Sequence, residues 1–130
     1  MRLRGFAGLL GAGGLLIAGA AWAAPSAPLQ ADVGPGQEVQ VLERIFAPGE
    51  SSGWHVHHGV EMTHVVKGEM TLNVTGEGVR VLRAGDRFKV ARDVAHEATN
   101  TGKADAGLIV TYLIDKGGPA KVPVPAPVKP

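Results

Sequence analysis

The stretch GESSGWHVHHGVEMTH, from Gly49 to His64, contains four of the five histidines of a 130-residue chain. His55 and His57 are two residues apart, so on a β-strand both side chains point to the same face. Glu61 follows the pair His58-Gly59, and a tight turn there would return Glu61 on the neighbouring strand, opposite the two imidazoles. Two nitrogen ligands and one carboxylate that converge in this way suit a first-row transition metal.

The other histidines are judged by the same alternation. His58 and His64 fall on the opposite parity to His57 and Glu61, so both are expected to face outward. His96 is the one histidine outside the window; it lies at the start of another predicted strand and is a candidate fourth ligand. Without a metal, these buried polar groups would need other partners or would cost free energy. A metal site is therefore favoured over a polar strand.

Short apolar runs with alternating side chains, broken by glycine, continue on both sides of this window. Turns marked by glycine separate them about every ten residues, and no helical period stands out. This spacing predicts an all-β sandwich or barrel formed by a single domain over residues 37–116.

The two ends of the chain differ from this domain. Arg2, Arg4, an apolar run from Gly5 to Ala21 and the A-x-A pattern at 21–23 predict a cleaved signal peptide over residues 1–23. The cleaved signal peptide leads us to expect export to the periplasm or the extracellular space. The alternative is an uncleaved membrane anchor. Residues 24–36 are expected to form a flexible N-terminal arm, and the Pro-rich residues 117–130 an extended tail.

The composition excludes several classes of function. Without Arg2 and Arg4, eleven basic residues stand against twelve acidic ones, so the mature chain has a net charge of about −1. This balance predicts neither a nucleic-acid partner nor stable membrane insertion after signal cleavage. The chain has no cysteine, which excludes thiol chemistry, thiolate metal sites and iron–sulfur clusters.

The sequence from Gly49 to Asn100 resembles the cupin superfamily. The first cupin motif, G-x5-H-x-H-x3,4-E-x6-G, is filled at each fixed position by Gly49, His55, His57, Glu61 and Gly68. The second, G-x5-P-x-G-x2-H-x3-N, keeps its spacing with Gly85, His96 and Asn100, and has Ala91 and Asp93 in place of the proline and the second glycine. Aspartate tolerates left-handed dihedral angles, so Asp93 can replace that glycine.

The resemblance implies a cupin double-stranded β-helix, which is a small jelly-roll barrel with one domain. It also implies that His55, His57, Glu61 and His96 bind one divalent transition metal inside the barrel. Iron, manganese, copper, nickel and zinc all suit these ligand types, so the sequence does not distinguish them.

The surroundings of the metal are less well defined by the sequence. Asn100 shares the parity of His96 and is expected either to support the site or to be a turn amide. The strand register is ambiguous by one residue. The inward residues beside the metal are therefore Met62 or Thr63, Met70 or Thr71, and Leu72 or Asn73. Met70 and Leu72 are taken as pocket residues, and a mostly aliphatic wall favours a small or partly apolar ligand.

Cupins perform many reactions, so fold and ligands do not determine the function. The favoured hypothesis is a metal-dependent oxidoreductase of the dioxygenase kind, acting on a small organic substrate. Resemblance to flavonol-cleaving cupins implies that Glu61 is the general base. The alternative is a non-catalytic module that binds a carboxylate or a sugar through the metal. Epimerases of this fold use no metal, and the complete ligand set argues against that reaction. Open edge strands favour a homodimer.

Overall fold

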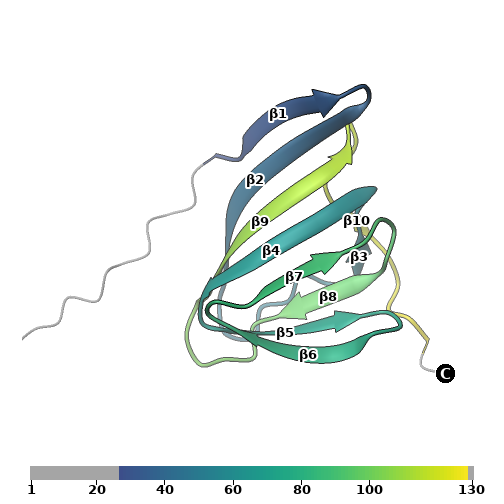
Figure 1. The fold of residues 1–130 in the computed structure, drawn as a ribbon. Coiled ribbons are helices and arrows are strands. Elements are labelled where there is room, and N and C mark those ends of the chain that lie inside the picture. The colour runs from purple at the N-terminus through teal and green to yellow at the C-terminus, as the bar shows by residue number, and fades with distance from the viewer. Residues whose placement is uncertain (1–26, 129–130) are drawn as a thin grey trace, which may run out of the picture.

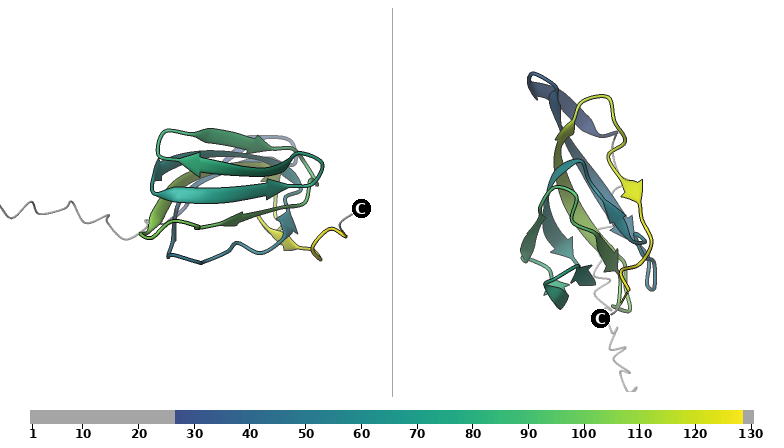
Figure 2. Two further views of the ribbon diagram at one scale, coloured as in Figure 1. Left: turned by 90° about the horizontal axis from the view of Figure 1, so that it is seen from below. Right: turned by 90° about the vertical axis from the view of Figure 1, so that its right-hand side faces the viewer.

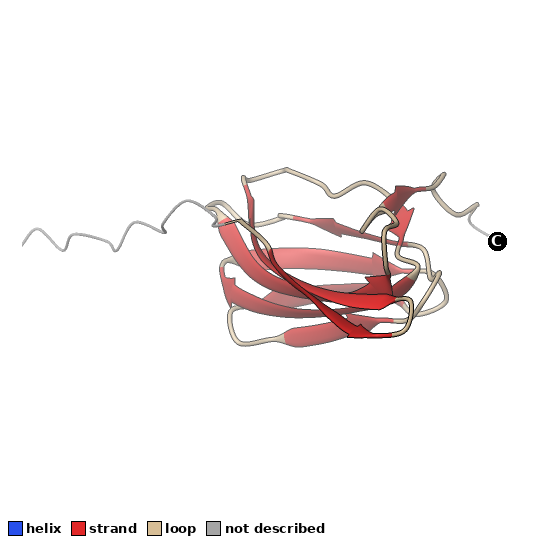
Figure 3. Ribbon diagram, turned by 90° about the horizontal axis from the view of Figure 1, so that it is seen from above, coloured by secondary structure: helices blue, strands red, loops and turns tan. Residues whose placement is uncertain are grey.

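The structure is a computed structural model, and it describes residues 27–128. This part of the chain is built from strands and loops, with no helix (Figures 1 and 3). The signal peptide predicted for residues 1–23 lies outside the described residues. The strands are β1 (Leu29–Gly34), β2 (Gln37–Phe46), β3 (His55–Val56), β4 (Gly59–Lys67), β5 (Glu69–Val74), β6 (Gly78–Arg83), β7 (Arg87–Val90), β8 (His96–Thr99), β9 (Ala106–Asp115) and β10 (Val122–Pro123).

The strands form two five-stranded sheets. The order of the first sheet is β1-β2-β9-β4-β7 and that of the second is β10-β3-β8-β5-β6; the strand pairs are all antiparallel. The two sheets face each other, as the views in Figure 2 show. The prediction of an all-β jelly-roll barrel is confirmed. Residues 27–128 include no helix that is long and apolar enough to cross a membrane.

Alternating burial along the strands places the core between the sheets. On β5, Met70, Leu72 and Val74 are buried and alternate with more exposed residues. On β4, Thr63 is 3% exposed and Met62 is 48% exposed, which settles the strand register that the sequence left open. The buried hydrophobic cluster consists of Phe46, Val65, Met70, Leu72, Val74, Leu82, Phe88, Val90, Ala98, Ala106, Leu108 and Val110.

Both terminal segments contribute edge strands: β1 lies in the segment expected to be a flexible arm, and β10 lies in the segment expected to be an extended tail. Residues Leu29–Gly34 form β1, which pairs with β2 at the edge of the first sheet. In the Pro-rich tail, Val122 and Pro123 form β10 at the edge of the second sheet. Proline is tolerated at a sheet edge because no further strand needs its missing N–H. The composition suggested loose segments, but the edges of β2 and β3 offer both segments main-chain partners.

Two close backbone contacts shape the barrel around the histidine window. At Gly59, the position of a Cβ would lie 2.0 Å from the Leu113 carbonyl oxygen, so strands β4 and β9 approach more closely there than any side chain allows. Asp93 has a φ of 61°, the only left-handed non-glycine residue among residues 27–128. Asp93 therefore replaces glycine in this turn, as expected, and its N–H donates to the His57 carbonyl at 2.9 Å.

Candidate metal centre

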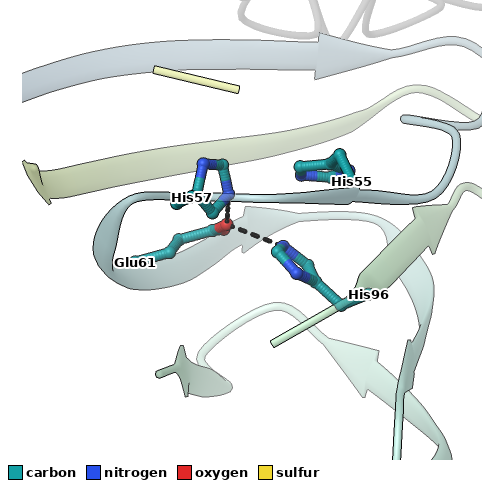
Figure 4. A group of neighbouring side chains, drawn as sticks. All are labelled: His55, His57, Glu61 and His96. Atoms are coloured by element: carbon teal, nitrogen blue, oxygen red, sulfur yellow. Dashed lines mark hydrogen bonds and ion pairs between the residues drawn. The ribbon is translucent and has the colours of Figure 1, made fainter. Parts of the chain in front are cut away.

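Three strands and one short connection deliver four polar side chains to one point inside the barrel. His55 lies on β3, His57 immediately follows β3, Glu61 lies on β4 and His96 on β8. One potential ligand atom from each of the four lies within 4.8 Å of those of the others (Figure 4). His55 and His96 are direct cross-strand partners, and their ring centroids are 4.2 Å apart. None of the four residues is more than 6% exposed.

A main-chain carbonyl oxygen lies against the Nδ1 atom of each of the three imidazoles. The Nδ1 atom of His55 lies 2.7 Å from the Gly53 carbonyl oxygen, and that of His96 lies 3.0 Å from the Val94 carbonyl oxygen. The Nδ1 atom of His57 contacts the carbonyl oxygen of Ala120. Because a carbonyl only accepts, each Nδ1 carries the hydrogen, and Nε2 is the atom left for a ligand. This is the tautomer that a metal bound through Nε2 requires.

Glu61 is the anionic member of the group. Its Oε2 lies 2.7 Å from the Nε2 atom of His57 and 3.1 Å from that of His96, and its Oε1 accepts from the Thr63 hydroxyl at 2.6 Å. Burial alone would raise the pKa of Glu61, but its contacts with His57, His96 and Thr63 outweigh burial and hold the pKa well below its usual range. A negative charge is thus kept among the imidazoles.

Burial and the nearby charges also shift the pKa values of His55 and Tyr112. Burial, with smaller contributions from nearby positive charges, lowers the pKa of His55 to about 4 against the raising effect of its bond to the Gly53 carbonyl. His55 is therefore neutral over the physiological range, which is the form that binds a metal. Tyr112 on β9 packs against His57, with ring centroids 4.6 Å apart. Burial, and then the charge of Glu61, raise the pKa of the Tyr112 hydroxyl well above its ordinary value.

The donor chemistry fits a divalent transition metal. Three imidazole Nε2 atoms and one carboxylate oxygen face a common point, and the carboxylate offsets part of the charge of the ion. Four protein ligands leave one or two positions free on a five- or six-coordinate ion. A small ligand can occupy such an open position.

A cavity of about 70 Å³ adjoins the four residues. His55, Glu61 and His96 line one part of it. The remaining lining residues are Arg44, Phe46, Ser52, Phe88, Ala98, Leu108, Val110, Tyr112 and Lys121. The cavity therefore has polar side chains around the metal ligands and a wall of aliphatic and aromatic side chains. Its size suits a ligand of only a few heavy atoms.

Three predicted pocket residues do not line this cavity. Asn100 is 1% exposed, but its amide nitrogen donates to the Phe46 and Ala104 carbonyl groups, and its Oδ1 accepts from the Gly102 N–H at 2.9 Å. Asn100 therefore braces a turn, which is the second of the two roles that the sequence left open. Met70 and Leu72 do point inward, but they belong to the hydrophobic core and do not line the cavity.

The remaining histidines face away from the site. His58 lies at the exposed turn after β3 and donates from Nδ1 to Asp93 at 2.7 Å. His64 lies on the opposite face of β4 from Glu61 and is half-buried. Both placements agree with the alternation argument.

Sequence reasoning placed none of the other residues that line the cavity, and Tyr112, Arg44 and Lys121 show why. Tyr112 lies in the run GLIVTYLID, in which both faces are apolar, so the sequence does not show which residues point inward. Arg44 shares the parity of Phe46 on β2, which was a usable signal, but a charged side chain is not expected to line a barrel interior. Lys121 lies in the Pro-rich tail and carries no local signal at all.

Comparison with known proteins places these residues in a family. The cupin domain family model matches residues 42–112, more than half of the chain. Oxalate oxidase 2 of Hordeum vulgare is 33% identical over 87 residues, which cover 61% of this chain and 39% of that protein. Germin-like protein 3-3 of Oryza sativa subsp. japonica is 32% identical over 92 residues, covering 64% of this chain and 40% of the relative.

Solved structures show the same relationship. A recombinant oxalate oxidase in complex with glycolate superposes with a TM-score of 0.55 at 29% identity, over 68% of this chain and 46% of that chain. An RmlC-like cupin from Shewanella frigidimarina superposes with a TM-score of 0.53 at 28% identity, over 69% of this chain and 86% of that chain. The chain spans about two-fifths of the length of the curated relatives it matches.

Proposed function

Because the chain belongs to the cupin family, we propose that it binds one divalent transition metal through His55, His57, Glu61 and His96. We also propose that it is a metal-dependent oxidoreductase, of the dioxygenase kind, for a small organic substrate. The observation that carries this proposal is the orientation of the three buried imidazoles, whose Nδ1 atoms are fixed by carbonyl groups so that each Nε2 faces the Glu61 carboxylate region. The similarity to oxalate oxidases supports the oxidoreductase class.

The metal, when bound, would supply a Lewis acid and a redox centre. The residues of the chain would bind the substrate and accept its proton. The cavity of about 70 Å³ admits a small substrate, and its apolar wall limits how much water accompanies the substrate. Glu61 lines the cavity and is the proposed proton acceptor, as the general base. Thr63 restricts the carboxylate by donating to Oε1, so the orientation of Glu61 is set before the substrate arrives.

The test has two stages. The protein is first stripped of metal, then loaded separately with Fe²⁺, Mn²⁺, Cu²⁺, Ni²⁺ or Zn²⁺, and the bound metal is measured by elemental analysis. We expect one ion per chain, and none in the His57→Ala/His96→Ala double variant. A matched control, His64→Ala, removes an imidazole from the outer face of β4 and should bind metal as the parent does.

Oxygen uptake is then measured on a panel of enols, flavonols and oxalate. Turnover with at least one metal is the expected result, and Glu61→Gln should lose it. If ligands raise the unfolding temperature of the metal-loaded protein but no metal supports turnover, the protein is instead a metal-dependent module that binds a small carboxylate or sugar. Absence of metal binding in the folded parent chain would contradict both.

Export and dimerisation are further proposals. The segment 1–23 has the pattern of a signal peptide, so we propose that the protein is exported. Mass spectrometry of the protein from its native compartment should give Ala24 as the first residue. We also propose a homodimer, supported by exposed apolar side chains on the outer face of the first sheet, where Met62 is 48% and Ile109 is 37% exposed. Light scattering on the purified protein tests this.

A further inference from the structure

The C-terminal tail returns to the metal centre and runs beside it. We call residues 120–124 the C-terminal strap. It lies antiparallel to the segment that carries the first two histidines. The main-chain contacts along it are the pairs Val122–Val56 and Pro123–His55 and the hydrogen bond from the Val124 N–H to the Trp54 carbonyl at 3.0 Å. The Ala120 carbonyl also holds His57. The position of Lys121, between Ala120 and Val122, is therefore fixed on both sides.

Lys121 reaches the cavity from this strap. Its Nζ donates to the Ser52 carbonyl oxygen at 2.6 Å, and its side chain lines the cavity together with His55, Glu61 and His96. The ammonium group thus lies at the cavity that the metal ligands also line, while it stays accessible to solvent.

Lys121 and Arg44 are the two cationic side chains that line the cavity, and they differ in whether an acidic side chain neutralises their charge. Arg44 forms an ion pair with Glu50, with Nη2 and Oε1 3.2 Å apart, and stacks over the Phe46 ring at 4.9 Å. Among the ion pairs of residues 27–128, none includes Lys121, whose hydrogen bond goes to an uncharged carbonyl. One of its three N–H groups is used in that bond, and the remaining two can donate to a ligand.

We propose that Lys121 is a specificity-determining residue of the cavity, and that its ammonium group binds a carboxylate of the ligand held at the metal. This inference rests on the proposed function, because the ligand is placed by the metal. The strap brings the charge to the cavity, the hydrogen bond to Ser52 restrains it, and a metal held by the four ligands would bind another group of the same ligand. A neutral ligand gains nothing from this charge, whereas a carboxylate gains a charge-assisted hydrogen bond.

The test compares two ligands of similar size and shape, one with a carboxylate and the other with a neutral amide in its place. Protein loaded with Co²⁺ is titrated with glycolate and, separately, with its neutral analogue glycolamide, and binding is followed by the visible absorption of the metal. In Lys121→Gln, glycolate binding should weaken about three- to fivefold, the upper part of the range for one exposed ionic contact, while glycolamide binding changes less than about twofold. Lys121→Arg should retain most of the glycolate affinity.

Two controls separate charge at the cavity from other effects. Lys89→Gln removes the same charge from the exposed face of β7 and should leave both affinities unchanged. Raising the salt concentration should weaken glycolate binding more in the parent than in Lys121→Gln, because salt screens an exposed charge.

The outcomes are distinguishable. If the parent takes up no Co²⁺, the proposed function fails and this inference fails with it. If Lys121→Gln takes up Co²⁺ and binds glycolate as tightly as the parent does, only the role of Lys121 is overturned. Equal weakening for glycolate and glycolamide, or loss of Co²⁺ in the variant, would show that the residue maintains the strap and does not recognise charge.

Discussion

Replacement of Gly59 by alanine should destabilise the fold strongly, although alanine is the smallest possible change. A Cβ at residue 59 would lie 2.0 Å from the Leu113 carbonyl oxygen and 2.6 Å from the Ile114 Cα. Real Cβ atoms are essentially never closer than 3.0 Å to such atoms, so β4 must move away from β9 by about 1 Å. The neighbouring hydrogen bond, from the Asp115 N–H to the His58 carbonyl at 3.1 Å, would be broken or stretched.

The expected cost follows from these contacts. Overpacking a rigid environment costs about 1–3 kcal/mol, and a lost main-chain hydrogen bond adds about 1 kcal/mol. Together they predict a loss of about 3 kcal/mol in the free energy of unfolding, a large fraction of the stability of a small domain. Because Gly59 separates His57 from Glu61, the displaced strand should also weaken metal binding.

Urea denaturation of the metal-free protein, followed by far-UV circular dichroism, measures the loss. The matched control is Gly118→Ala, where a Cβ would meet its nearest neighbour, the Asp115 carbonyl oxygen, at an ordinary 3.7 Å. This variant should stay within about 0.5 kcal/mol of the parent. Equal urea midpoints for Gly59→Ala, Gly118→Ala and the parent would refute the close approach of β4 and β9 and the reasoning built on it.

Three further outcomes are expected. Asn100→Ala should lower the free energy of unfolding by about 2–4 kcal/mol in a urea titration, because buried main-chain partners lose the amide, yet it should leave the metal stoichiometry unchanged. Arg92→Gln should raise the pKa of Asp115, measured by NMR, because the guanidinium hydrogen bonds that lower it are lost. The lowered pKa favours the folded state above the ordinary pKa of an aspartate, so in the parent this contribution disappears as pH falls through the folded value. Added metal should raise the unfolding temperature progressively with its concentration, whereas Glu61→Gln should show a smaller rise because the ion loses its anionic ligand.

The sequence predicted the parts of the site that depend on local alternation and motif spacing. The i, i+2 spacing of His55 and His57 was enough to place both side chains on one face. Glu61 followed from the turn at Gly59. His96 was different: it lies 35 residues from Glu61, so only the resemblance to a known motif, and not any local pattern, related the two. Asp93 was expected in a glycine position and does have a left-handed φ of 61°.

The other parts of the site depend on contacts between segments that are distant in the sequence, and no periodic pattern predicts such contacts. Asn100 was ambiguous because an inward amide can serve a ligand or a turn, and only the coordinates show that the carbonyl groups of Phe46 and Ala104 use it. Lys121 could not be placed, since alternating prolines predict an extended chain but not where that chain runs. Tyr112 was hidden in a strand with two apolar faces.

The contact between Ala120 and His57 has a consequence for the order in which the centre is assembled. The two residues are 63 positions apart, and Ala120 follows all four proposed ligands in the sequence. During synthesis or translocation, a chain that has emerged only as far as Gly118 already contains all four proposed ligands but lacks the carbonyl that orients one of them. The final orientation of His57 is therefore reached only after residue 120 has been added, and a segment expected to be only an extended tail contributes to the site.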